Sequence, residues 1–187
     1  MSLNHFILKQ DERIADAIRP RDVSSVIQPE WLAGEGLRQL VEMNLQFPIM
    51  ESKNVVYVDM IENPVLFVSD PFKVLLEKVS PQSLFRPAGM IDQRRMRQAT
   101  YWLALPPRVD CLSIHSEFHP TGTIKRLIID ADKVGNRPIL QIAGLREKVI
   151  VINLALAEGI LRRGFTGIKL VKVEKASEME RLSMPLS

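Results

Sequence analysis

The sequence predicts an α+β fold: a mixed, largely antiparallel sheet with two strand-helix-strand units and helices packed on it. Two segments of the chain indicate this class, residues 67–87 and 151–171. Each runs from an apolar strand through a polar N-cap into an amphipathic helix of two or three turns, and then into another strand. A shift of 84 positions pairs Ser69 with Asn153, but identities between the segments are almost absent. The general pattern of a strand-helix-strand unit therefore explains the likeness better than a duplication does.

The helix of the first segment is expected over residues 70–79. Ser69 is a suitable N-cap, and Pro71 suits the first helical turn. The apolar face of this helix consists of Phe72, Leu75, Leu76 and Val79.

The helix of the second segment is expected over residues 154–163. Asn153 is its N-cap, Gly164 is its C-cap, and Arg162 and Arg163 sit favourably at the negative end of the helix dipole. Its expected buried face consists of Leu154, Ala157, Ile160 and Leu161.

Further strands are expected where short apolar or β-branched runs end at turn residues. They are residues 5–9, 54–61, 65–68, 83–91, 97–105, 147–152 and 166–174. Two strand-like runs, 124–129 and 138–142, flank Gly135-Asn136, which predicts a hairpin.

The first fifty residues carry the weakest pattern. Helical turns are expected at residues 11–18 and a helix at 29–44, where Gly34 and Gly36 lower the helix propensity. The expected organisation is an N-terminal arm or cap (1–53), a main α+β domain (54–174) and a polar C-terminal tail (175–187).

The composition indicates a cytoplasmic protein that does not enter a membrane. No apolar run approaches the roughly 20 residues that cross a bilayer, and the first eighteen residues carry acidic side chains where a signal peptide needs an apolar segment. One cysteine excludes an internal disulfide and a multi-cysteine zinc site.

The net charge of +3 is small, although the isoelectric point is near 9.1. Nucleic-acid binding needs a concentrated basic face, and the nearest candidate is the segment from Arg94 to Trp102, with Arg95 and Arg97 beside aromatic side chains. A solvated strand whose aromatic residues enter the core is the favoured interpretation, because charged residues are mostly surface residues.

The stretch Asp110 to Pro120, DCLSIHSEFHP, is the densest group of chemically active residue types. Cys111, His115 and His119 share a face on either a helix or a strand, so their spacing is compatible with a metal site or a cysteine-histidine pair. No HExxH, CxxC or G-x-S-x-G motif accompanies them. A structural cysteine and exposed loop histidines are the favoured interpretation. No phosphate-binding loop or other cofactor motif is present, so no cofactor is expected.

Four short motifs in the C-terminal half are similar to motifs of a known protein family. They are Ile142-Ala143-Gly144, Ile150 to Asn153, Leu156-Ala157-Glu158 and Gly164-Phe165-Thr166-Gly167. With these motifs, residues 54–174 resemble the bacterial polymorphic-toxin immunity proteins of the myxobacterial immunity-domain type.

The resemblance implies a protein that binds a toxin and occludes its active site, with no catalytic residue to carry over. The stretch from Asp110 lies between Pro106-Pro107 and a strand near Ile124, where a connecting loop can carry binding residues. The candidate partner-contact residues are Asp110, His115, Glu117, His119, Arg94 and Arg95. Two alternatives stay open: a hydrolase that uses Cys111 or the His115/His119 pair, and nucleic-acid binding through the Arg94–Trp102 segment.

Overall fold

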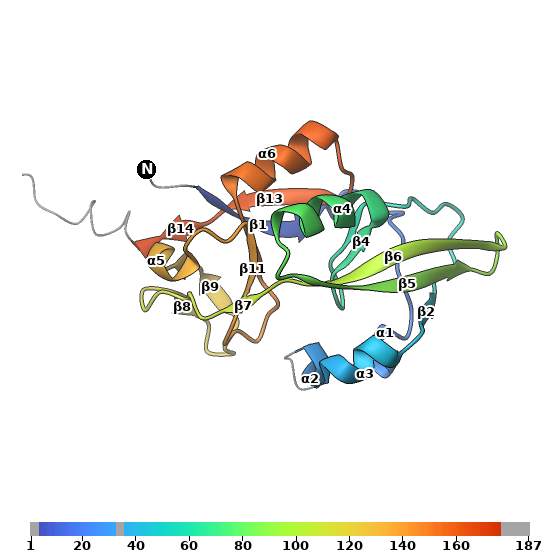
Figure 1. Cartoon of the computed structure of the whole chain (residues 1–187), viewed down its shortest axis with the longest axis horizontal. Helices are drawn as coiled ribbons and strands as arrows, with labels where there is room; N and C mark the ends of the chain where they lie inside the picture. Colours follow the sequence, from blue (N-terminus) through green and yellow to red (C-terminus); the bar gives the residue numbers. More distant parts are fainter. Residues whose placement is uncertain (1–3, 33–35, 177–187) are drawn as a thin grey trace, which may run out of the picture. The chain divides into compact units, whose positions relative to one another are not determined.

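The α+β class is confirmed by the computed structural model, which describes residues 4–32 and 36–176 (Figure 1). The described residues form two compact units. Unit 1 comprises residues 4–9, 106–164 and 169–176, and unit 2 comprises residues 10–32, 36–105 and 165–168. Each unit contains a five-stranded sheet.

These units differ from the expected division at residues 53 and 174. The first 53 residues supply β1 (His5–Gln10) to the sheet of unit 1 and β2 (Leu45–Pro48) to the sheet of unit 2. They are therefore integral to both sheets, because strand pairing is a long-range contact that a weak local pattern does not reveal. Of the expected tail, residues 177–187 lie outside the described residues.

The sheet of unit 2 has the strand order β2-β5-β6-β4-β3. Its centre is the long antiparallel hairpin of β5 (Leu84–Asp92) and β6 (Arg97–Leu105), which pairs in register from Leu84 opposite Leu105 to Asp92 opposite Arg97 (Figure 1). β4 (Phe67–Ser69) runs antiparallel to β6, β3 (Met60–Ile61) antiparallel to β4, and β2 parallel to β5.

The helices of unit 2 follow local sequence signals. In α4 (Asp70–Val79), the Ser69 hydroxyl accepts the Phe72 N–H at 3.4 Å, and Phe72, Leu75 and Leu76 are buried, as the sequence predicts. The expected helix at 29–44 is present as α2 (Pro29–Leu32) and α3 (Leu37–Glu42); residues 33–35 lie outside the described residues. One further short helix, α1 (Val23–Val26), precedes them. The rings of Phe47 and Phe67 meet in the core at 5.6 Å.

The sheet of unit 1 has the order β13-β1-β12-β11-β7. Its strands are β13 (Ile168–Lys172), β12 (Ile150–Asn153), β11 (Ile139–Ile142) and β7 (Arg108–Val109), besides β1. Two small sheets accompany it: β8 (Glu117–Phe118) with β9 (Ile124–Arg126), and β10 (Ile128–Ile129) with β14 (Glu174–Lys175).

The helix α6 (Leu154–Arg163) is capped as predicted, since Asn153 Oδ1 accepts the Leu156 N–H at 2.9 Å and Gly164 closes the helix with φ +63°. Its buried face is Leu156, Ala157 and Ile160. The prediction for Leu161 is wrong, because this side chain is 70% exposed.

The two strand-helix-strand units share one arrangement. In unit 2, β4 and β5 flank β6 and α4 connects them; in unit 1, β12 and β13 flank β1 and α6 connects them. In both units the first strand runs antiparallel to the middle strand. The middle strand of unit 2 follows next in the chain, whereas the middle strand of unit 1 comes from the N-terminal end.

Three sequence expectations are wrong in detail. Residues 11–18 form successive turns rather than helix, with the N–H of Ile14 bonded to Asp11 and that of Ala17 to Ile14. Of residues 54–61, only β3 is a strand; Val56 forms a single isolated parallel bridge with Ala17, which does not extend into a ladder.

The hairpin expected around Gly135-Asn136 is also wrong. Asp130 accepts the N–H groups of Asp132 and Lys133 and so starts a helical turn, α5 (Ala131–Val134). As a result β10 pairs with β14 and β11 pairs with β7 and β12, instead of pairing with each other.

Candidate functional site

The stretch singled out in the sequence leads into the β8–β9 hairpin of unit 1. Two backbone hydrogen bonds close the hairpin loop. The N–H of His119 donates to the carbonyl of Thr123 at 2.9 Å, and the N–H of Gly122 donates to the carbonyl of His119 at 2.8 Å. Gly122 has φ +81°, a conformation that glycine adopts without strain. Four candidate contact residues predicted from the sequence are exposed in this region, Asp110, His115, Glu117 and His119.

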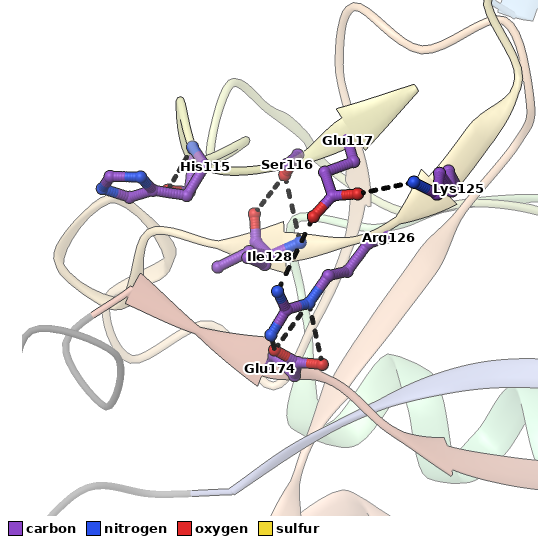
Figure 2. A network of polar contacts seen from close by, with 8 residues as sticks. His115, Ser116, Glu117, Lys125, Arg126, Ile128 and Glu174 are labelled. Carbon is purple, nitrogen blue, oxygen red and sulfur yellow. Dashed lines mark hydrogen bonds and ion pairs between the residues drawn. The ribbon is translucent and has the colours of Figure 1, made fainter. Parts of the chain in front are cut away.

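A charged network lies across the hairpin (Figure 2). Glu117 on β8 contacts Lys125 Nζ at 3.1 Å and Arg126 Nη1 at 3.7 Å, and Arg126 Nη2 reaches Glu174 on β14 at 2.6 Å. The hydrogen bond from Lys125 lowers the pKa of Glu117, and the hydrogen bond to Glu174 raises the pKa of Arg126. Arg126 therefore links the hairpin to a strand that is distant in the sequence.

Three further contacts hold the hairpin against the rest of unit 1. The Ser116 hydroxyl donates to the carbonyl of Ile128 at 2.8 Å and accepts its N–H at 3.0 Å (Figure 2). Arg146 donates to the carbonyl of Thr121 at 2.7 Å. The Ile124 N–H donates to Glu147 at 3.0 Å. A two-stranded hairpin alone is marginally stable, so these side chains supply the fixation that its few backbone pairs do not.

Large apolar side chains are exposed on this anchored region. Ile114 is 94% exposed at the turn before β8, and Phe118 on β8 is 43% exposed. The His115 N–H bonds to the Ser113 hydroxyl at 3.2 Å, and its ring points away from the charged network (Figure 2). Exposed apolar side chains rimmed by polar groups are typical of protein-interaction surfaces. We call the region of residues 114–126 the hairpin surface.

Cys111 is a core residue of unit 1. It has no exposed area and packs among Ile129, Leu140 and Val151. Burial, with a smaller contribution from the Asp110 carboxylate, raises the pKa of its thiol to about 11. The thiol is thus protonated at neutral pH, which favours the structural interpretation of this cysteine. Among the described residues, no group of three or more His, Cys, Asp or Glu side chains is arranged to hold a metal ion.

Arg94 and Arg95 belong to unit 2, at the turn between β5 and β6. Arg95 bonds to Asp92 at 2.9 Å and to the carbonyls of Ser52 and Lys53 at 3.0 and 2.7 Å, and Arg94 reaches the Ser52 carbonyl at 3.4 Å. Arg95 therefore serves to close its own turn.

The aromatic residues of the same segment are also engaged within unit 2. Tyr101 is buried. Lys73 lies 4.5 Å from the centre of the Trp102 ring. Arg97 is engaged as well, since its guanidinium lies 4.0 Å from the centre of the Tyr57 ring. The side chains that would stack a base are thus buried or in contact with other residues of the chain.

Sequence reasoning missed several residues of the hairpin surface. Ile114 and Phe118 each stand between polar residues, a local pattern that does not predict whether an apolar side chain is buried or exposed. Arg146 and Glu174 lie 20 or more positions from the residues they hold. Only the three-dimensional structure brings Arg146 to the carbonyl of Thr121 and Glu174 to the guanidinium of Arg126.

Comparison with known families found no family model that matches the sequence, and comparison with curated proteins found no match either. Among the described residues, the helices are too short or too polar to span a membrane.

Proposed function

We propose that the chain is a protein-binding protein of the immunity type, which neutralises a toxin by binding it through the hairpin surface. The observation that supports this function best is the exposure of Ile114, at the turn before β8, and of Phe118, on the β8–β9 hairpin that side chains hold in place. The resemblance of residues 54–174 to immunity proteins supplies the expected partner, a cognate toxin. We further propose a cytoplasmic location, where such a protein would meet its target.

The make-up of the hairpin surface suits protein recognition. Interfaces obtain most of their energy from a few apolar or aromatic side chains that a polar rim surrounds. Here Ile114 and Phe118 are the apolar centre, and His115, Glu117 and His119 are the exposed rim. Because Arg126, Arg146 and Ser116 already hold the hairpin, little conformational entropy is lost when a partner binds.

A growth-rescue assay tests this function. The products of neighbouring genes are expressed with and without the chain, and the tagged chain is used to capture the product that arrests growth. We expect rescue and a stoichiometric complex. Ile114→Asp should weaken that complex about 30-fold, since loss of an interface centre costs about 2 kcal/mol.

The matched control is Leu161→Asp, because Leu161 is an exposed leucine of the same unit, on α6. It should change the affinity less than about twofold. Circular dichroism should show both variants folded. The proposal is wrong if no neighbouring product is toxic or captured, or if both variants weaken the complex equally.

A further inference from the structure

Unit 2 contains two cavities that adjoin each other. The larger has a volume of about 580 Å³ and lies between residues 10–20 and 61–64; the smaller has about 190 Å³ and lies between residues 15–19 and 50–55. They share Ala17, Ile18, Arg19 and Met50 in their walls. We call these two adjoining cavities together the acidic groove. Its larger part falls in the size range of natural ligand sites.

The floor of the acidic groove is apolar. Ala17, Ile18 and Ile61 belong to the buried core of unit 2, and Ile14 packs against that core. Met50, which lines both cavities, is 51% exposed. A ligand in the groove would therefore cover the exposed part of Met50 and of the half-buried Ile14.

The rim of the groove carries mostly carboxylates. Glu12 and Glu62 line the larger cavity, and Asp16 and Glu51 line the smaller one. Arg19 is the only basic residue among the described lining residues.

Three of these carboxylates outnumber the one basic residue described in the lining, Arg19. Within the described part of the chain, none of Glu12, Asp16 and Glu51 takes part in an ion pair. A concave site lined by charges of one sign concentrates the potential and attracts ligands of the opposite sign.

The walls of the groove are held by backbone hydrogen bonds within unit 2. The N–H of Ile18 bonds to Val56 at 2.9 Å, that of Val56 to Asp16 at 2.8 Å, and that of Met50 to Arg19 at 2.8 Å. At the other end, Gln10 and Glu62 bond to each other's backbone N–H at 2.8 and 3.0 Å. The groove is thus preformed, which lowers the cost of binding.

We infer that the acidic groove binds an arginine- or lysine-containing segment of a partner protein. The aliphatic stems of these side chains fit the apolar floor, and their charged ends fit the carboxylates of Glu12, Asp16 and Glu51. A small inorganic cation would use the carboxylates and leave the floor uncovered. The inference goes beyond the hairpin surface, since it concerns residues of unit 2 and stands if the hairpin surface binds nothing.

Fluorescence anisotropy with the full chain tests this site. The probe is a labelled octapeptide of alternating arginine and serine. Two matched peptides replace arginine with citrulline, which has the same shape without charge, or with 2-amino-3-guanidinopropionic acid, which keeps the guanidinium charge without the long stem. We expect saturable binding of the arginine peptide, with at least about tenfold weaker binding of both others, because each lacks one of the two matching features.

The variants then locate the site. Glu12→Gln/Glu51→Gln should weaken the arginine peptide about tenfold. The control Glu30→Gln/Glu42→Gln removes the same charge from exposed positions of α2 and α3 and should leave the affinity within about twofold. Ile114→Asp should have no effect.

Three results would overturn the inference. They are no saturable binding of the arginine peptide up to about 1 mM, equal binding of the 2-amino-3-guanidinopropionic acid peptide, and equal loss in the two double variants.

Discussion

Cys111 and Asp92 are both buried, yet their environments have opposite effects on ionisation. The pKa of the Cys111 thiol is raised to about 11, because burial and the nearby Asp110 carboxylate both disfavour the thiolate. Around Asp92, burial also opposes the charged form, but hydrogen bonds from the Arg95 side chain and backbone outweigh it and lower the pKa of the carboxyl group. Hydrogen bonds from Arg95 thus favour the ionised form of Asp92, whereas burial favours the protonated form of Cys111.

Cys111 should react slowly with thiol reagents in the folded protein. At pH 8 the raised pKa alone lowers the thiolate fraction about a hundredfold relative to an ordinary cysteine, and burial blocks the reagent as well. We expect labelling by a disulfide reagent to be slow in buffer and rapid in urea. Rapid stoichiometric labelling of the folded chain would show instead an accessible, reactive thiol.

Asp92 should contribute to stability at neutral pH and lose that contribution in acid. Its pKa is lower in the folded chain than in the unfolded chain, so its contribution is present above the unfolded pKa and is lost as the pH falls through the folded pKa. Asp92→Asn should therefore lower the free energy of unfolding at pH 7 and have less effect at pH 3, as measured by urea denaturation.

The control for this pH dependence is Asp110→Asn, because Asp110 is exposed in unit 1. It should leave the difference in stability between pH 7 and pH 3 close to that of the unmodified chain. An equal loss at both pH values in Asp92→Asn would refute the electrostatic explanation.

At the scale of elements, the two long helices begin with the same device. A side chain at the N-cap accepts the N–H three residues later, in α4 from Ser69 and in α6 from Asn153. Ser69 has an additional role, since its hydroxyl donates to Asp59 at 2.6 Å. Asp59 also accepts the N–H and the hydroxyl of Thr166. The start of α4 is thus tied to two loops of unit 2, whereas Asn153 caps α6 by accepting the Leu156 N–H.

Asn153→Ala should destabilise the protein by about 1 kcal/mol, the usual effect of removing an N-cap acceptor. Asn153→Asp should retain most of the stability, because a carboxylate accepts the same N–H and suits the positive end of the helix dipole. Urea denaturation measures both. Equal losses in the two variants would mean that the amide has some role other than accepting the Leu156 N–H.

At the scale of the whole molecule, the path of the chain makes unit 1 dependent on its first residues. β1 is a middle strand of a sheet whose other strands lie beyond residue 107. Leu8 on this strand is buried. Formation of this sheet therefore requires pairing between segments more than a hundred residues apart, which costs loop-closure entropy before any contact forms.

Leu8→Asp should destabilise unit 1, because the substitution places a charged carboxylate on β1 at a position that is buried in the core. Hydrogen exchange followed by mass spectrometry should show much faster exchange in β1 and β12, which pair with each other. Lys9→Ala, at an exposed position of the same strand, should leave the exchange unchanged. Unchanged protection of β12 in Leu8→Asp would contradict the central role of β1.

The sequence by itself determined the α+β class, the capped helices α4 and α6, and the strands β5 and β6, although not their pairing. Their signals are N-caps, helical periodicity and short apolar runs that end at turn residues, all of which act within about ten residues. The sequence also predicted correctly that Asp110, His115, Glu117 and His119 are exposed.

Only the tertiary structure decided where β1 and β10 pair, that Ile114 and Phe118 stand exposed, and that the cavity lined by Glu12 adjoins the cavity lined by Glu51. The physical reason is the range of the interactions. A cap or a helical face is formed by neighbours in the chain, so its residues can be read in order. Strand pairing and the grouping of side chains on a surface depend on which distant segments gain most by burying their apolar faces together, and no local pattern contains that comparison.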